Sequence, residues 1–409
     1  MGGAFLLLLM SGIAGSVLGQ ASPRAIVSVA DLGAKADGKT DDASAIQAAI
    51  DRVSRTGGRV LIPKAASPYL IGRSLVIAAD NVELFGPGAT LRLANGAGSG
   101  KIVDCIEIRG TKAKPSKNTI VRGLTIDANF CAQKNAGNPR GIDCDWASGV
   151  SIEGVTIRRA FVSLTFGMGV AHSEARDCLV TDYYDDGFNA SGDFVSDGCH
   201  HITFIRCRAV DSRPGADCAW EIEDGASNVT LVDCQAHNVH NSAFEVRSHA
   251  VKKSSQMRGI TFIRCRATNV KNAATWTGWF VRGWDHHIST SGVTLVDCET
   301  NGNCTFVNGV NNVSVMGGRF TGRFLVGVYP TDVSKKIDPR RTPHQARDVV
   351  VTGAEITALE ANLSPAVGPK ERYQPTLTLL RTRVTQRAAI RPDRANLTAL
   401  DCRLPRPSP

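Results

Sequence analysis

The sequence predicts an all-β fold, a single-stranded right-handed parallel β-helix solenoid with an N-terminal capping helix. The first observation is a phrase of alternating apolar and polar residues, typical of a β-strand, that returns through the middle of the chain. Its copies begin at Ser148, His200, Ser227, Arg258, Ser291 and Asn311. The second is their spacing of roughly 20–35 residues, which varies as if loops of different length interrupt a constant strand. The third is a composition with 40 Gly and 6% aromatic residues, which suits short strands and tight corners.

The N-terminus predicts export. Phe5 to Leu18 are largely apolar and are followed by the small residues Gly19 and Ala21. This is the pattern of a secretory signal peptide, which we place at residues 1–21. No later segment is apolar for long enough to span a bilayer. We therefore expect a secreted or periplasmic protein.

After the signal peptide we expect one parallel β-helix domain over residues 26–405. It divides into an N-terminal cap at 26–73, central turns at 74–328, a surface loop at 329–346 and weaker terminal turns at 347–405. The loop is predicted because that stretch is rich in Pro and in charged residues.

The charge of the chain narrows the choice of partner. The formal net charge is +9 and the sequence pI is about 9.0. A basic surface suits nucleic acid, an anionic membrane or an acidic polysaccharide. The chain has no dense Lys/Arg run or aromatic-basic motif of a nucleic-acid binder. We expect a polysaccharide partner, anionic in character, and no nucleic acid; scattered solubilising charge is the alternative, and the oligomeric state is left open.

The start of the β-helix is predicted to be closed by a helix over residues 42–55. Asp41 or Asp42 can cap it. Its apolar face holds Ile46, Ala49, Ile50 and Val53. Gly57 and Gly58 end the helix, and Val60 to Ile62 form the next strand. A cap is needed because an open parallel stack would expose unpaired backbone donors and acceptors.

This opening segment resembles the start of the pectate-lyase-like superfamily. The shared pattern, D-x-G-A-x-x-D-G-x-x-D-D-x-x-A-I-Q-x-A-I followed by G-G-x-V-x-x-P, is matched from Asp31 to Ile50 and then from Gly57. The resemblance implies the β-helix fold. It leaves the reaction open, because polygalacturonase-like hydrolases, alginate epimerases, lyases and phage tailspikes share the same opening.

The cysteines follow the repeat. Five of the twelve occupy the same place in successive copies, namely Cys178, Cys207, Cys234, Cys265 and Cys298. Because free cysteine behaves as a small buried hydrophobe, we expect a stacked ladder of free thiols. Cys131 and Cys144, on either side of a polar loop, are the better candidates for a disulfide. The chain has no Cys-x-x-Cys pair, which argues against a thiolate zinc site.

A second strand follows each copy of the phrase, and its two faces differ. One parity is apolar and is predicted to be core, with Trp220 and Trp279 among its members. The other parity gives two outward columns of side chains. The first column holds Asp143, Asn189, Glu221, Glu245 and Phe280, and the second holds Asp145, Ser191, Glu223, Arg247 and Arg282.

These columns provide the candidate active site of a carbohydrate-active enzyme. Stacked carboxylates repel one another, so perturbed carboxylates or a bound cation would account for them. We expect catalytic roles for Glu221, Glu223, Glu245, Arg247, His249 and Lys252. We expect substrate contacts from Asp143, Asp145, Asp186, Arg282, Trp284, His286 and His287. Oxygen atoms of Asn189, Glu221 and Glu223 could hold calcium, and no other cofactor is expected.

The favoured chemistry is β-elimination of an acidic, uronate-containing polysaccharide. A lyase needs positive charge on the uronate carboxylate, with a base and an acid for the two proton transfers. The segment Phe244 to His249 resembles the arginine strand of the alginate-lyase and chondroitinase-B family of β-helix lyases. The resemblance implies that Arg247 is the catalytic arginine, although Glu223 stands where that family has a lysine.

Two alternatives stay open. An inverting hydrolase of the polygalacturonase-like type needs two carboxylates about 6.5–9.5 Å apart, a spacing that Glu221 and Glu223 fit. The N-T-D, G-H-G and R-I-K patterns of polygalacturonases and the D-P-H-E pattern of alginate epimerases are absent. The other alternative is a non-catalytic glycan-binding or assembly β-helix, which would carry the same columns without turnover.

Overall fold

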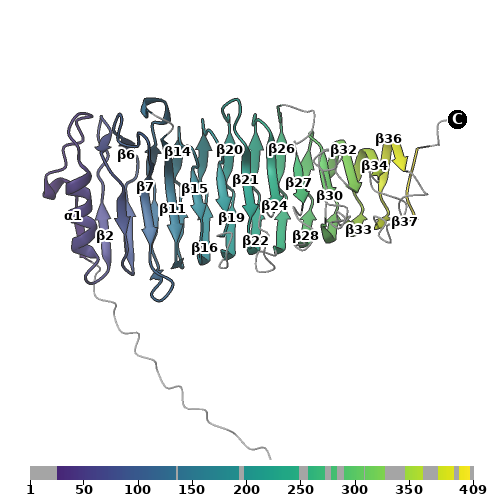
Figure 1. Cartoon of the computed structure of the whole chain (residues 1–409), viewed down its shortest axis with the longest axis horizontal. Helices are drawn as coiled ribbons and strands as arrows, with labels where there is room; N and C mark the ends of the chain where they lie inside the picture. The colour runs from purple at the N-terminus through teal and green to yellow at the C-terminus, as the bar shows by residue number, and fades with distance from the viewer. Residues whose placement is uncertain are drawn as a thin grey trace, which may run out of the picture.

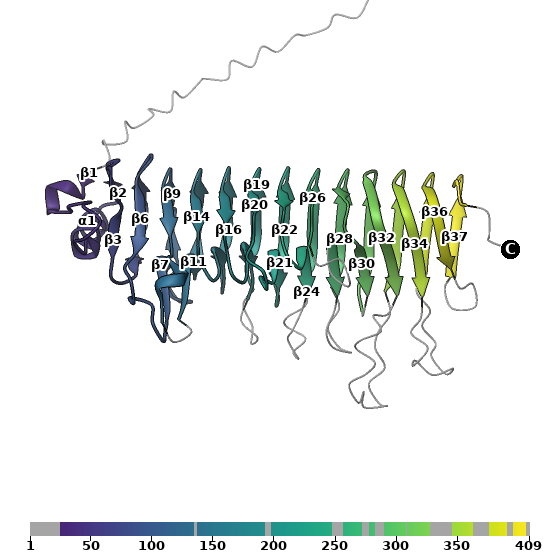
Figure 2. The same cartoon turned by 90° about the horizontal axis from the view of Figure 1, so that it is seen from above.

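A computed structural model shows the chain as a right-handed parallel β-helix (Figures 1 and 2). The structure describes residues 25–134, 137–192, 198–247, 257–271, 278–282, 290–307, 309–327, 346–362, 376–390 and 396–405. The signal-peptide residues 1–21 and almost all of the loop at 329–346 lie outside this range. Within the described residues, no helix is long and apolar enough to cross a membrane.

The recurring phrase forms the first of three stacks of parallel strands, here called stack A. Two short strands, β8 (Ser116–Lys117) and β12 (Ala147–Ser148), lie beside it. Its main path, in hydrogen-bonded order, is β1 (Ala25–Ser28), β2 (Gly58–Leu61), β5 (Val82–Phe85), β9 (Ile120–Arg122), β13 (Ser151–Glu153), β16 (Ala171–Arg176), β19 (His200–Ile205), β22 (Ser227–Val232), β25 (Arg258–Ile263), β28 (Ser291–Val296), β31 (Asn311–Met316), β33 (Arg347–Thr352), β35 (Thr376–Leu380) and β37 (Asn396–Leu400).

Short strands that follow the phrase after a corner form stack B. In pairing order they are β3 (Tyr69–Ile71), β6 (Thr90–Leu93), β10 (Thr125–Asp127), β14 (Thr156–Arg158), β17 (Leu179–Thr181), β20 (Arg208–Val210), β23 (Gln235–His237), β26 (Arg266–Thr268) and β29 (Glu299–Thr300).

The strands that carry the two predicted columns form stack C. They are β4 (Leu75–Ile77), β7 (Ile102–Arg109), β11 (Asn138–Asp145), β15 (Leu164–Phe166), β18 (Phe188–Ala190), β21 (Cys218–Glu223), β24 (Ser242–Arg247), β27 (Trp279–Arg282) and β30 (Cys304–Val307). Stacks B and C merge at the C-terminal end into the longer strands β32 (Arg319–Gly327), β34 (Glu355–Asn362) and β36 (Arg383–Ile390).

The register of the stacks confirms the predicted repeat. Val229 pairs with Ile260, which pairs in turn with Val293. The apolar parity of stack C points inward as expected, and Trp220 and Trp279 are fully buried. Phe244 lies between them, with ring centroids 5.0 Å from Trp220 and 4.7 Å from Trp279. One continuous core therefore runs along the axis.

The predicted cap is present as α1 (Ala43–Val53), shorter than 42–55, and it packs against β1, β2 and β4 at the N-terminal end (Figure 1). Its buried face is the predicted one. Asp42 precedes the helix, but its carboxylate accepts hydrogen bonds from the Lys35 and Ala36 amides of the preceding turn. The Asp41 carboxylate accepts from the Ala43 amide instead. Two short 3-10 helices, η1 (Ala30–Leu32) and η2 (Phe130–Ala132), complete the helical content of the described residues.

The cysteine ladder is also as predicted, with five buried free thiols in successive turns. Each donates to a backbone carbonyl of the preceding turn, as Cys207 does to Ala175 at 3.3 Å. The predicted disulfide between Cys131 and Cys144 is wrong. Cys144 lies on the inward-facing side of its strand in stack C and is fully buried. Cys131 is exposed, and its thiol contacts the Tyr184 hydroxyl.

Replacing Phe244 with Ala should destabilise the central turns strongly, because it opens a cavity between two stacked tryptophans. We expect a loss of about 3–5 kcal/mol in the free energy of unfolding, measured by urea denaturation. Met316→Ala is the control, since Met316 is 44% exposed, and it should unfold near wild type. Equal unfolding midpoints for the two variants would contradict the stacked core.

Candidate active site

A pocket of about 370 Å³ opens on stack C over the central turns. Strands β11, β15, β18, β21 and β24 each contribute side chains to it, and the connections before β15 and β18 complete its wall. The lining residues are Arg140, Phe161, Val162, Thr165, Asp185, Asp186, Asn189, Ser191, Glu221, Glu223 and Arg247. The site therefore draws on turns far apart in sequence that the parallel register brings side by side.

The first column differs from its prediction by one turn. Asn189, Glu221, Glu245 and Phe280 stack directly, as expected. However, Asp143 does not lie over Asn189, because Thr165 of the short strand β15 pairs with both and separates them. The strand Leu164–Phe166 has three residues and one outward polar side chain, that of Thr165. Its alternation of apolar and polar residues is too short for the strand to be recognised in the sequence as a member of the repeat.

The predicted outward face is recessed. The exposed fraction is 5% for Asp143, 4% for Glu221 and 1% for Glu245. Charged groups removed from water in this way must be paired or must change their protonation state. Three arrangements in the pocket meet this requirement.

The first arrangement is an amide bridge. The Asn189 Nδ2 atom donates to Glu221 Oε2 and to Glu223 Oε1, each at 3.2 Å. Glu221 and Glu223 are alternate residues of β21, separated by Ile222. Because one nitrogen atom bonds both, the bridge keeps the two carboxylate oxygens close together. It fixes both side chains toward the same side of the pocket.

The second arrangement is an arginine clamp. Arg247 forms ion pairs with Glu221, with Glu245 at 3.2 Å and with Asp217 at 3.1 Å. Although burial opposes the charge, the neighbouring carboxylates Glu245 and Glu221 raise the pKa of the Arg247 guanidinium. Arg247 thus neutralises the stacked pair Glu221 and Glu245.

The third arrangement is a pair of neighbouring buried carboxyl groups, those of Asp186 and Glu221, which line the same wall of the pocket. Burial first, and then the charge of Asp185, hold the pKa of Asp186 well above its ordinary value. Burial and the charge of Asp186 likewise hold the pKa of Glu221 well above its own. The pair therefore retains a proton at a pH where ordinary carboxyl groups have lost theirs.

Asp185 lies beside this pair at the pocket wall. Burial and the charge of Asp217 raise its pKa to about 6. The backbone amide of Asp217 donates to the Asp185 carbonyl at 3.0 Å, so the two residues occupy matching places in successive turns.

Several predicted residues lie outside the pocket. Glu245 is buried, pairs with Arg247 and is not among the lining residues, so its expected catalytic role stays a prediction. Arg282 is also buried, 3.6 Å from Glu245 and over the ring of Phe280. Arg282 is not among the described residues that line the pocket, and its expected substrate contact stays a prediction.

Asp143 and Asp145 lie at the N-terminal side of the pocket and do not line it. Asp143 pairs with Arg140 at 3.1 Å, and the Asp145 carboxylate accepts the Met168 amide. Burial, followed by the charge of Asp143, raises the pKa of Asp145 to about 6. The remaining predicted residues, His249, Lys252, Trp284, His286 and His287, lie outside the described residues.

Sequence reasoning missed Asp217, Arg140 and Phe161. The strands that give the two columns were aligned from Gly141, Gly187 and Ala219 onward. Arg140 lies one residue before the first of these starting points, and Asp217 lies two residues before the last. Extending the alignment by two residues toward the N-terminus would have placed Asp185 over Asp217. Phe161 gives no such signal, because it belongs to a connection outside the repeat.

The predicted calcium ligands do come together, since Asn189, Glu221 and Glu223 share one hydrogen-bonded cluster. Asn189 directs its amide nitrogen, a donor, at both carboxylates, whereas calcium takes oxygen ligands. Its Oδ1 atom is buried without a hydrogen-bond partner. The cluster would thus accept calcium only with the amide turned over, and a calcium site stays a prediction.

Comparisons with known proteins agree with this architecture. A family model described as "Rhamnogalacturonase A/epimerase, pectate lyase-like" matches residues 26–240. Alginate lyase 7 of Azotobacter vinelandii is 30% identical over 180 residues, which cover 38% of this chain and 20% of that protein. The matched stretch thus spans a small part of the relative.

Two solved structures are similar in fold. The A-module of the mannuronan C-5 epimerase AlgE6 from Azotobacter vinelandii superposes with a TM-score of 0.67 at 18% identity, over 93% of this chain and 100% of that one. A hyperthermoactive exopolygalacturonase from Thermotoga maritima gives 0.58 at 12% identity, over 93% and 92%. At these identities the likeness concerns the fold alone.

The family model covers more than half of the chain, in the part that holds the cap, the turns up to residue 240 and every lining residue of the pocket except Arg247. The protein therefore belongs to the rhamnogalacturonase A/epimerase, pectate lyase-like family.

Proposed function

We propose that the protein is an enzyme that hydrolyses a uronate-containing polysaccharide in the pocket of stack C. The observation that carries the proposal is the buried pair of carboxyl groups of Asp186 and Glu221 beside a further carboxylate, Glu223, in one pocket. Glycoside hydrolysis needs one carboxyl group that is protonated and a second that acts as base or nucleophile. The pocket provides both within one wall.

The proton of the pair fits the role of general acid. Burial beside other carboxylates raises the pKa of a carboxyl group, which then keeps its proton to higher pH and can give it to a glycosidic oxygen. Glu223 lines the same pocket and is only partly buried, so it is the second carboxylate in our proposal. The Asn189 bridge orients Glu223 relative to Glu221.

The nature of the substrate is supported by charge and by relatives. Arg140 and Arg247 bring positive charge to the wall of an otherwise acidic pocket, and the chain as a whole is basic. Two relatives that are 30% identical in sequence over part of their length, alginate lyase 7 and the mannuronan C5-epimerase AlgE4, are named for polymers of uronic acids. Export, predicted from residues 1–21, would bring the enzyme to such polymers outside the cell.

β-Elimination is the second candidate, favoured by the alginate lyase relative and by the place of Arg247 at the wall. It needs a basic side chain free to remove a proton. Of the described residues that line the pocket, Arg140 and Arg247 are the basic ones, and both are paired with carboxylates. His249 and Lys252, which lie outside the described residues, are the other expected bases.

The products will separate these reactions. We expect wild type to release reducing ends from polygalacturonate or polymannuronate without the ultraviolet absorbance of an unsaturated uronate. Glu221→Gln should lower turnover by about 10²–10⁴-fold with little change in melting temperature, because Gln keeps the bond from Asn189. Glu299→Gln, on exposed β29, is the matched control. An unsaturated product from wild type would establish the lyase, and inversion at C5 by NMR without cleavage would establish an epimerase.

The pH profile of turnover should report the carboxyl pair. Activity should fall as pH rises through the raised pKa of the pair, since the general acid is then lost. Asp185→Asn removes a charge that raises the pKa of Asp186, so the basic limb should move to lower pH. Asp233→Asn, at an exposed corner, should leave the profile unchanged. A limb that stays in place in Asp185→Asn would show that this pair is not the acid.

Arg247→Ala tests the clamp. Removing the cation takes the ion pair with Arg247 from two buried carboxylates, Glu221 and Glu245, although Arg282 still lies 3.6 Å from Glu245. We expect a loss of about 3–5 kcal/mol in stability, measured by thermal and urea unfolding. Arg266→Ala, an exposed arginine paired with Glu299 at 3.5 Å, should change little. An unchanged melting temperature in Arg247→Ala, with turnover abolished, would instead assign Arg247 to the chemistry of a lyase.

A further inference from the structure

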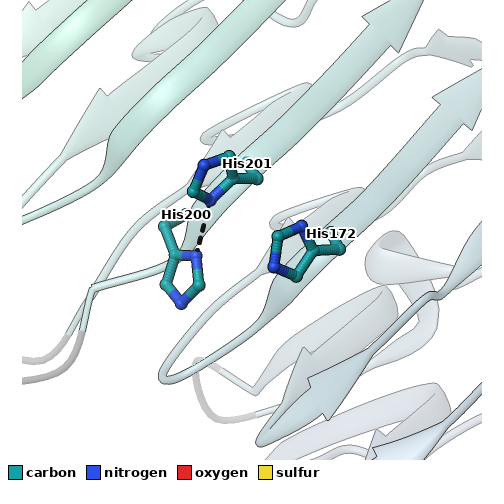
Figure 3. Close-up of side chains that lie close together, drawn as sticks. All are labelled: His172, His200 and His201. Carbon is teal, nitrogen blue, oxygen red and sulfur yellow. Dashed lines mark hydrogen bonds between the residues drawn. The ribbon is translucent and has the colours of Figure 1, made fainter.

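Three histidines gather on stack A, on a different strand stack from the candidate active site. His172 lies on β16, and His200 and His201 open the next strand, β19. Figure 3 shows the three rings around one shared space, with a hydrogen bond between His200 and His201. Each ring offers a nitrogen, and these atoms all lie within 4.8 Å of one another.

The backbone explains how two of these rings meet. His172 and His201 occupy equivalent positions at one corner of successive turns, and both have positive φ, 49° and 55°. The same corner elsewhere holds residues that tolerate this conformation, namely Asn118, Gly149, Asn228, Gly259, Gly292, Asn312 and Asp348. Stacking of the corner places the His172 and His201 rings 4.7 Å apart.

The stacking of corner residues explains why His172 and His201 are neighbours, but it does not explain why the ring of His200 lies beside them. This residue precedes the corner position, yet its Nδ1 atom lies 2.9 Å from Nδ1 of His201. Two nitrogens that share one zinc ion, each bound at about 2.0–2.1 Å, lie roughly 3 Å apart. His200 therefore completes a set of three donors rather than a pair of stacked rings.

Space for an ion and its remaining ligands is present beside these rings. A cavity of about 380 Å³ is lined by His172, His201, Glu174 and neighbouring residues of β13, β16 and β19. Gly149, at the corner position of the turn before His172, also lines it. His172 and His201 are exposed and His200 is half-buried, so the rings can turn inward without repacking the core.

We propose that His172, His200 and His201 form a surface site for a divalent transition-metal ion, with Zn²⁺ as the reference ion. Neutral imidazole is a ligand suited to zinc, copper and nickel, and three histidines with open positions form a known type of zinc environment. The missing Cys-x-x-Cys pair does not bear on a site built from histidines.

The site would tie two successive turns together. His172 belongs to β16, whereas His200 and His201 belong to β19, so one ion would link neighbouring strands of stack A. Metal bound to the folded chain alone raises its apparent stability. The inference concerns stack A and does not depend on the reaction proposed for stack C.

The test is calorimetric titration of the full chain with Zn²⁺ at pH 7.5, together with thermal unfolding. We expect one ion per chain at this site, a higher melting temperature with Zn²⁺ than with Ca²⁺, and weaker binding at lower pH as protons compete. The double variant His172→Asn/His201→Asn should lose at least about tenfold in affinity and lose the zinc-dependent rise in melting temperature. Asn is chosen because Asn118 and Asn228 hold the same corner in nearby turns, which preserves the fold.

His237→Asn is the matched control, since His237 is an exposed histidine on β23 of stack B. It should bind Zn²⁺ as wild type does. Wild-type affinity in the folded double variant would overturn the proposal, because other histidines would then hold the ion. Absence of binding to wild type at millimolar Zn²⁺ would overturn it as well.

Discussion

The whole structure depends on the parallel register between successive turns. Each strand hydrogen-bonds to the equivalent strand of the next turn, so residues in equivalent positions of the repeat stack directly. The core is one result, with Phe188, Trp220, Phe244 and Trp279 in a continuous row. The cysteine ladder and the corner of left-handed residues follow from the same register.

The same constraint creates the electrostatic problem at the pocket. In-register stacking sets Asn189, Glu221 and Glu245 one above the other, and all three side chains are buried. Carboxylates this close cannot all be ionised without compensation. The chain resolves the conflict with the Arg247 clamp, the Asn189 bridge and the protonated pair of Asp186 and Glu221. Stacked carboxylates would destabilise an ordinary surface, but here they raise the pKa of carboxyl groups in the pocket, as a general acid requires.

The two candidate sites use the repeat in different ways. On stack C, residues of five strands converge on one pocket, and each turn contributes a different group. On stack A, a corner position that mostly holds Asn, Asp or Gly is taken by histidine in two consecutive turns, and His200 adds the third ring. Both sites arise because substitutions within an otherwise constant repeat become neighbours in space.

The sequence by itself determined the fold, the cap and much of the stacking. Period-two alternation and recurrence at near-constant phase are properties of local chemistry, so the pairing of Val229 with Ile260 and of Glu221 with Glu245 could be predicted. The position of Arg247 beside the carboxylates followed from the same alignment.

Only the tertiary structure decided which of those side chains meet in a pocket. The short strand Leu164–Phe166 carries too little alternation to be aligned, so the extra turn between Asp143 and Asn189 was not visible. Phe161 lies in a connection whose path depends on contacts distant in sequence. The burial of Glu245 and Arg282, and the raised pKa values of Asp186 and Glu221, depend on what covers each residue. Solvent access is a property of the assembled turns, and a repeat pattern does not encode it.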